Sequence, residues 1–116
     1  MSSPLKKIPA RFYRSVGGSE PVREWLKALD LRDRKAVGKD IQKVEYGWPL
    51  GLPVCRPLTN GLWEVRSNIS DGRTVRVIFC IAGGCMVLLH GFIKKSQKTP
   101  QQDLELALKR KRDLET

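Results

Sequence analysis

The sequence has no long hydrophobic run. No stretch approaches the roughly 18 apolar residues that a membrane-spanning helix needs. The N-terminal segment MSSPLKKIPARF has neither a long apolar core nor a small-residue cleavage site, so it does not resemble a signal peptide. We therefore expect a cytoplasmic protein with no membrane partner.

Cysteine and histidine are also scarce. The three cysteines, Cys55, Cys80 and Cys85, cannot all pair, and their spacing matches no metal-binding pattern. We expect Cys80 and Cys85 to lie on adjacent strands as small hydrophobic residues. His90 is the only histidine. The sequence thus predicts no metal site and no cofactor.

Acidic residues are too few to balance the basic ones. The 116 residues include 22 Lys and Arg but only 12 Asp and Glu, which gives a net charge of +10. So large a charge on so short a chain favours a polyanionic partner, most often a nucleic acid. A solvated basic surface and a surface neutralised by an acidic protein are the alternatives. The length predicts a single domain, residues 1–116.

The hydrophobic periodicity predicts an α+β fold. Ser19 is predicted to cap a first helix, because apolar residues recur at helical spacing after it, as they do again over residues 31–46. Thr99 is predicted to cap a last helix, with Pro100 at its first position. Alternating or continuous apolar runs predict four strands, at residues 8–14, 62–68, 73–81 and 85–93. We expect a twisted, mainly antiparallel four-stranded sheet with two N-terminal helices on one face and a C-terminal helix.

The turn at residues 70–72 sets the register of the middle hairpin. A three-residue loop whose glycine is left-handed pairs Val65 with Val77 and Trp63 with Phe79, all on one apolar face. A two-residue loop would mix the faces. Because one buried face strongly specifies register, we predict the three-residue loop.

In that register Arg66 lies directly opposite Arg76. Two unpaired arginines facing each other on a sheet repel, and a shared anion would resolve the repulsion. Alternatively, each could pair with a local acid such as Glu64, Asp113 or Glu115. Both arginines are candidate site residues.

Basic side chains also follow the last predicted strand. Lys94, Lys95 and Lys98 lie near the N-terminus of the predicted last helix, where the helix dipole adds positive potential. Arg56, in a proline-rich segment, is a further candidate for contacting a nucleic-acid backbone phosphate. Exposed basic loops are the alternative for all four.

His90 is a candidate general base, because its ordinary pKa lies near neutrality. A strand-face histidine that makes one hydrogen bond is the alternative. The turn Ala82-Gly83-Gly84 could hold two or three residues, so the face that His90 occupies is open.

Three segments, GLWEVR (61–66), GRTVRVIF (72–79) and LHGFIKKSQKTP (89–100), resemble in this order the RelE/ParE superfamily of bacterial toxins, and within it the HigB-like, phage-related branch. The resemblance implies a metal-independent endoribonuclease that cleaves mRNA on the ribosome. Arg66 and Arg76 would clamp the scissile phosphate, and His90 or Glu64 would be the base. One of the two lysines would stabilise developing charge. Side chains alternate along an extended chain, so only one can face the phosphate, and the superfamily's basic residue after the last strand favours Lys95.

The resemblance also implies a cognate antitoxin, expected to be a small helix-turn-helix protein, together with the ribosome and mRNA as partners. The competing function is that of a ParE-like toxin, which shares the scaffold but binds DNA gyrase without nucleolytic chemistry. A phage relic that keeps only the fold is a third possibility.

Overall fold

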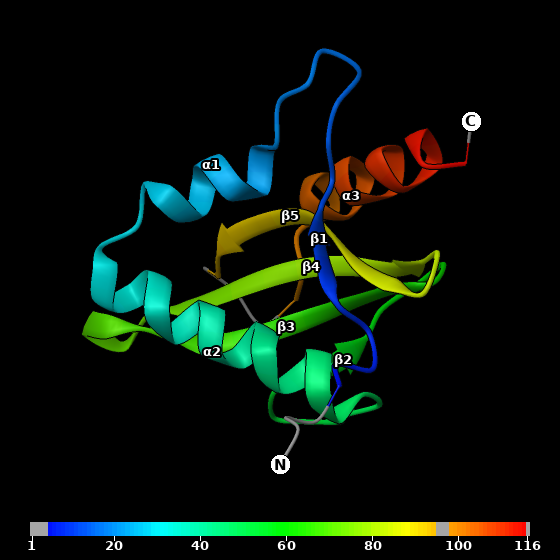
Figure 1. Cartoon of the computed structure of the whole chain (residues 1–116). Coiled ribbons are helices and arrows are strands. Elements are labelled where there is room, and N and C mark those ends of the chain that lie inside the picture. Colours follow the sequence, from blue (N-terminus) through cyan, green and yellow to red (C-terminus); the bar gives the residue numbers. More distant parts are fainter. Residues whose placement is uncertain (1–4, 95–97, 116) are drawn as a thin grey trace.

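The computed structural model describes residues 5–94 and 98–115 and has an α+β fold, which confirms the predicted class. These described residues form eight main elements, shown in Figure 1: β1 (Ala10–Phe12), α1 (Pro21–Lys27), α2 (Leu31–Gly47), β2 (Cys55–Pro57), β3 (Leu62–Asn68), β4 (Thr74–Ala82), β5 (Cys85–Ile93) and α3 (Gln101–Asp113). A single 3₁₀ turn, Ser70–Gly72, joins β3 to β4. Among the described residues, no helix has the length and hydrophobicity needed to cross a membrane.

The sheet is mixed and has five strands, in the order β1-β5-β4-β3-β2, so the prediction of four strands was wrong. The added strand is β2, which has three residues in the proline-rich segment and pairs antiparallel with β3. So short a strand has no periodicity of its own, and only its partner makes it a strand. β1 is parallel to β5 and is also shorter than predicted.

The predicted register of the middle hairpin is confirmed. Trp63 lies opposite Phe79, Val65 opposite Val77, and Arg66 opposite Arg76. The turn between these strands contains two left-handed residues, Asp71 and Gly72, with φ of 61° and 67°. Burial of one strand face therefore specified the pairing, as expected.

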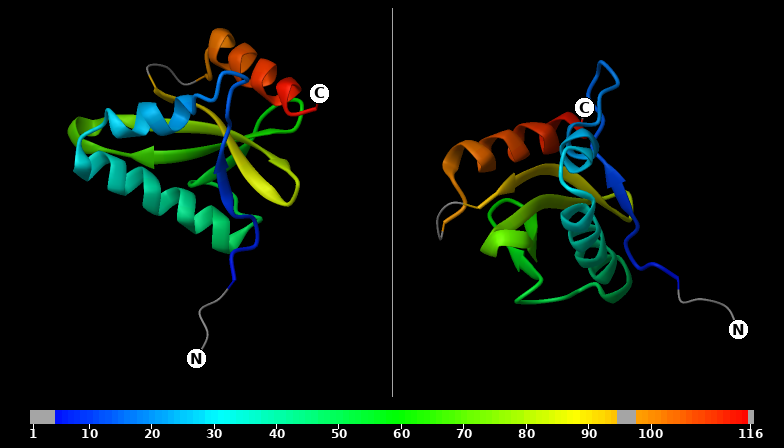
Figure 2. Two further views of the ribbon diagram at one scale, coloured as in Figure 1. Left: turned by 45° about the horizontal axis from the view of Figure 1, so that its top comes forward. Right: turned by 90° about the vertical axis from the view of Figure 1, so that its left-hand side faces the viewer.

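The sheet separates two hydrophobic clusters, and in Figure 2 α1 and α2 lie on one side of the strands and α3 on the other. α1 and α2 cover one face, where Val22, Val37 and Val44 pack against strand residues that include Val65 and Phe79. α3 covers part of the opposite face. There Leu104, Ala107 and Leu108 pack against a second set of strand residues: Leu62, Ile78, Cys80, Val87 and Leu89.

Two predicted helix caps are wrong. The residue that precedes α1 is Glu20, while Ser19 bonds to Ser15, at 2.8 Å between the two hydroxyl oxygens. α3 is preceded by Pro100, and the hydroxyl of Thr99 donates to Glu64 instead of accepting a hydrogen bond from a backbone N–H of the helix. In both cases a partner outside the helix competes successfully for the hydroxyl.

Gly91 is required by the packing of α1 on β5. A Cβ at this position would lie 2.8 Å from Cε3 of Trp25, closer than real side chains approach. The glycine therefore allows the indole ring to lie directly on the strand.

Candidate functional site

The carboxylate of Glu64 is fully buried on the α3 side of the sheet. Its Oε1 accepts a hydrogen bond from Arg76 Nη1 at 2.7 Å and lies 3.0 Å from Arg56 Nη2. Its Oε2 accepts from the Thr99 hydroxyl at 3.2 Å. Strand pairing produces this arrangement, because Arg56 lies directly opposite Glu64 on β2 and Arg76 lies diagonally across from it on β4.

Arg76 is the most buried cation of the site, with 1% of its side chain exposed. Burial lowers the pKa of Arg76 because it disfavours the charged form, while the carboxylate of Glu64 opposes that change. Of the two readings that the sequence left open for Arg76, pairing with Glu64 is the one observed. Its Nε atom is buried and, in the described part of the chain, has no hydrogen-bond partner.

Arg66 lies beside Arg76 but differs from it in being half-buried. Its backbone N–H donates to the carbonyl of Val54 at 2.8 Å, which ties β3 to the end of the segment before β2. Within residues 5–94 and 98–115, no carboxylate forms an ion pair with its guanidinium. Arg66 is therefore placed to bind an anion from outside.

Lys94 completes a group of four cations at the end of the sheet. Its backbone N–H donates to Thr74 at 2.7 Å, and its side chain is half-buried. Burial lowers the pKa of Lys94, and the positive charges of Arg76, Arg66 and Arg56 lower it further. We call Arg56, Arg66, Arg76 and Lys94 the cationic cluster.

Two other predicted lysines lie nearby in sequence. Lys98 is exposed in the segment that leads into α3. Lys95 lies outside the described residues, so its larger predicted role stays a prediction.

His90 forms a couple with Asp103 that the sequence analysis missed. A bulge in β5 places His90 opposite Ile78, and therefore on the face that α3 covers. Its Nε2 lies 2.5 Å from Oδ1 of Asp103, in the first turn of α3, and its ring stacks on Phe92 with centroids 5.7 Å apart. No local signal could reveal this couple, because it forms only when α3 docks on the sheet.

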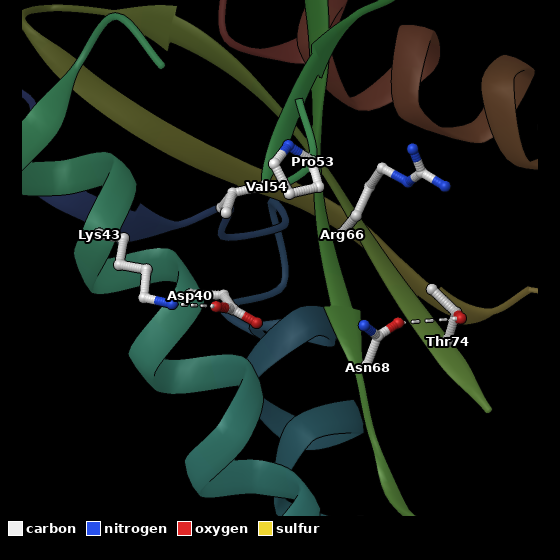
Figure 3. Close-up of a pocket in the computed structure, with 7 residues that line it drawn as sticks. All are labelled: Asp40, Lys43, Pro53, Val54, Arg66, Asn68 and Thr74. Atoms are coloured by element: carbon white, nitrogen blue, oxygen red, sulfur yellow. Dashed lines mark hydrogen bonds and ion pairs between the residues drawn. The ribbon is translucent and has the colours of Figure 1, made fainter. Parts of the chain in front are cut away.

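A polar groove adjoins the cationic cluster at the edge of the sheet (Figure 3). Its volume is about 330 Å³, and Arg66 belongs both to the groove and to the cluster. The groove is lined by residues of α2, the segment before β2, and the ends of β3 and β4: Asp40, Lys43, Pro53, Val54, Arg66, Asn68 and Thr74.

The chemistry available here is anion binding. The four cations and one carboxylate leave three positive charges in excess on one face of the sheet. Guanidinium groups bind phosphate in a bidentate manner, and a partly desolvated ammonium group adds a point charge. In the described part of the chain, no three His, Cys, Asp or Glu side chains come together in a way that could hold a metal ion.

Comparison with known proteins supplies a family. A family model described as phage derived protein Gp49-like (DUF891) matches residues 24–112, a span that includes every described member of the cationic cluster and both partners of the His90–Asp103 couple. No curated protein matches the chain significantly. The match covers well over half of the sequence, and we conclude that the chain belongs to the phage-derived Gp49-like family, a RelE-like family associated with the toxins of toxin–antitoxin systems.

Proposed function

We propose that the protein is the toxin of a type II toxin–antitoxin system and that it cleaves mRNA on the ribosome as a HigB-like endoribonuclease. The observation that carries this proposal is the cationic cluster, which places three excess positive charges next to a groove on an open part of the sheet. Membership of the Gp49-like family supports the toxin assignment. We take residues 1–116 to be one functional domain.

The proposed reaction is an in-line displacement at phosphorus. The ribose 2′-hydroxyl attacks the adjacent phosphorus and forms a new P–O bond as the bond to the 5′-oxygen of the next nucleotide breaks. A base removes the 2′-hydroxyl proton, and an acid gives a proton to the departing 5′-oxygen. Negative charge grows on the non-bridging oxygens, so fixed cations beside them lower the barrier.

Arg66 and Lys94 are the candidates for direct contact with that phosphate. The buried carboxylate of Glu64 pairs with Arg56 and Arg76, whereas Arg66 lines the adjoining groove and the charge of Lys94 lies close to that of Arg66. Arg56 is 32% exposed, so it can turn from Glu64 towards a bound phosphate while Arg76 keeps the carboxylate neutralised. Arg76 acts through Glu64 as a positioning residue, and Lys95 and Lys98 are expected to contact the RNA beyond the cluster.

His90 is the better candidate for the base. Glu64 is fully buried and its carboxylate pairs with two arginines, which favours its charged form and disfavours its taking up a substrate proton. Asp103 holds one nitrogen of the imidazole and thereby orients the ring, as a carboxylate does in other histidine-dependent enzymes. His90 lies two strand spacings from Glu64, roughly 10 Å, so the message must present its 2′-hydroxyl on the His90 side of the cluster.

An antitoxin is the expected protein partner. A net charge of +10 and the partly exposed Arg56, Arg66 and Lys94 favour an antitoxin that lays an acidic segment across the same surface. Such a complex should weaken as salt is raised.

The decisive experiment is primer extension on a defined message in translating ribosomes. Wild-type protein should produce new 5′ ends, and Arg66→Ala should reduce their rate of appearance about a hundredfold or more. Arg11→Ala, which removes an exposed arginine on the edge strand β1, is the matched control and should cleave normally. Inhibition of gyrase supercoiling without any cleaved message would assign the chain to the ParE-like class instead.

A further inference from the structure

Apart from Arg66, the residues that line the groove have no role in the proposed cleavage reaction. Asn68 and Thr74, at the paired ends of β3 and β4, line one side of it. Their side chains are joined only by a long hydrogen bond, 3.5 Å from the Thr74 hydroxyl to Asn68 Oδ1. Asn68 is exposed, so its amide can exchange that weak bond for a better partner.

The rest of the groove suits the other parts of a nucleotide. Pro53 and Val54 supply an apolar wall against which the face of a base can lie. Lys43 lies across the groove in an ion pair with Asp40, at 3.3 Å, and its side chain is 62% exposed. Figure 3 shows Arg66 extending away from this pair, so the two cations lie apart and can contact different phosphates.

We propose that this groove is a nucleotide subsite for single-stranded RNA, adjacent to the phosphate held by the cationic cluster. Arg66 links the two sites, because a strand whose phosphate lies on Arg66 must pass its neighbouring nucleotide along the groove. Asn68, which carries both donors and an acceptor, bonds the edge of the base, and Lys43 neutralises the next phosphate. The inference rests on the proposed function for its ligand, and it assigns the base preference to Asn68.

Binding of short 2′-O-methyl oligonucleotides tests the subsite separately from cleavage, because these strands lack the attacking hydroxyl. Fluorescence anisotropy is measured for a panel in which each base is varied in turn. Wild-type protein should prefer one base at one position, and Asn68→Ala should reduce that preference about tenfold. Gln102→Ala, which removes an exposed amide on α3, is the matched control and should keep the preference.

Salt titration gives a second readout. Lys43→Gln should weaken all sequences alike and reduce the slope of log affinity against log salt by about 0.7, the value for one phosphate of a single strand. Lys35→Gln, which removes an exposed charge from the same helix, should leave the slope unchanged.

The subsite is refuted if Asn68→Ala leaves the preference intact, or if it weakens every sequence equally. It is also refuted if Lys43→Gln and Asn68→Ala impair binding of poly-glutamate but not of RNA, because the groove would then serve an acidic protein segment. If either of these results is found and the wild-type protein still cleaves message in the primer-extension assay, the proposed function is retained and only the subsite is refuted. If Asn68→Ala loses the base preference but the wild-type protein cleaves no message, the subsite is retained and the proposed function is refuted.

Discussion

Arg76 and Glu64 form a buried ion pair, with Nη1 and Oε1 2.7 Å apart and both side chains almost fully covered. The pair lies beneath the more exposed Arg66, Arg56 and Lys94 and determines how much positive charge the surface retains. Without Glu64 the four cations would repel one another. Without Arg76 the carboxylate of Glu64 would still pair with Arg56 and would neutralise it. The pair therefore links the stability of the sheet to the properties of the candidate site.

Glu64→Gln should destabilise the fold by about 3–5 kcal/mol, because it leaves the buried guanidinium of Arg76 without its counter-ion. Urea unfolding measures the loss. Glu20→Gln, in an exposed pair with Arg23, should cost less than about 1 kcal/mol. The double variant Glu64→Leu/Arg76→Met should recover part of the loss, because it removes both charges. An unchanged unfolding midpoint for Glu64→Gln would show that the pair contributes nothing.

Arg66→Ala and Arg76→Ala should both abolish growth inhibition, but for different reasons. Arg66 is half-buried and forms no ion pair with a described acid, so Arg66→Ala should change the free energy of unfolding by only about 0.5 kcal/mol. Arg76→Ala removes the main partner of a buried carboxylate and should lower stability as well. Growth curves at matched expression, read with thermal unfolding, separate the two. A fully toxic Arg66→Ala protein would remove that residue from the site.

Cleavage should decline at alkaline pH through Lys94. Because burial and three nearby arginines lower the pKa of Lys94, this lysine loses its proton at a lower pH than an ordinary lysine, and the phosphate then loses one positive charge. Lys94→Arg keeps the charge and should extend activity to higher pH in single-turnover assays.

The companion comparison is Lys94→Ala against Lys95→Ala at neutral pH. Alternation allows one of these lysines to face the phosphate, and the neighbours of Lys94 include Arg66 and Arg76. A larger rate loss in Lys95→Ala would return the role to Lys95, as the superfamily resemblance predicts.

Asp33 should contribute to stability except in acid. Its carboxylate accepts from the backbone N–H of Ser70 at 3.0 Å, and from the Ser70 hydroxyl and Arg73 Nη2 at the same distance, which fixes the β3–β4 turn to α2. The backbone hydrogen bond from Ser70 is the largest cause of its lowered pKa, so the folded state binds the Asp33 proton more weakly than the unfolded state.

The contribution of Asp33 is therefore complete above its ordinary pKa of 3.8 and disappears as the pH falls through the lower, folded value. The melting temperature of Asp33→Asn should lie below that of wild type at neutral pH and approach it in strong acid. Asp40→Asn, in a more exposed pair with Lys43, should change the melting temperature less. Parallel curves for wild type and Asp33→Asn would contradict the linkage.

His90→Gln should slow single-turnover cleavage by about a hundredfold or more if the imidazole removes the 2′-hydroxyl proton. Asp103→Asn should produce a smaller loss, because it disturbs the orientation of the ring but leaves the base in place. Both proteins are also unfolded in urea as a control. A loss of stability without a loss of rate would mean that the couple only fastens α3 to the sheet.

Sequence patterns were enough to predict the α+β class, the hairpin register and the meeting of Arg66 with Arg76. These features follow from local periodicity and from the burial of one strand face, which a one-residue slip would expose. The family resemblance rested on the same segments, and the match to the Gp49-like family agrees with its assignment to RelE-like toxins.

Which charges are available to a ligand depends on the tertiary structure. Arg66 and Arg76 are both arginines on paired strands, yet Arg66 is half-buried whereas Arg76 is buried in an ion pair with Glu64. Strand β2, the hydrogen bond of Thr99 to Glu64 and the His90–Asp103 couple all join segments distant in the chain. Such contacts depend on where the proline-rich segment and α3 dock, and no short-range pattern contains that information.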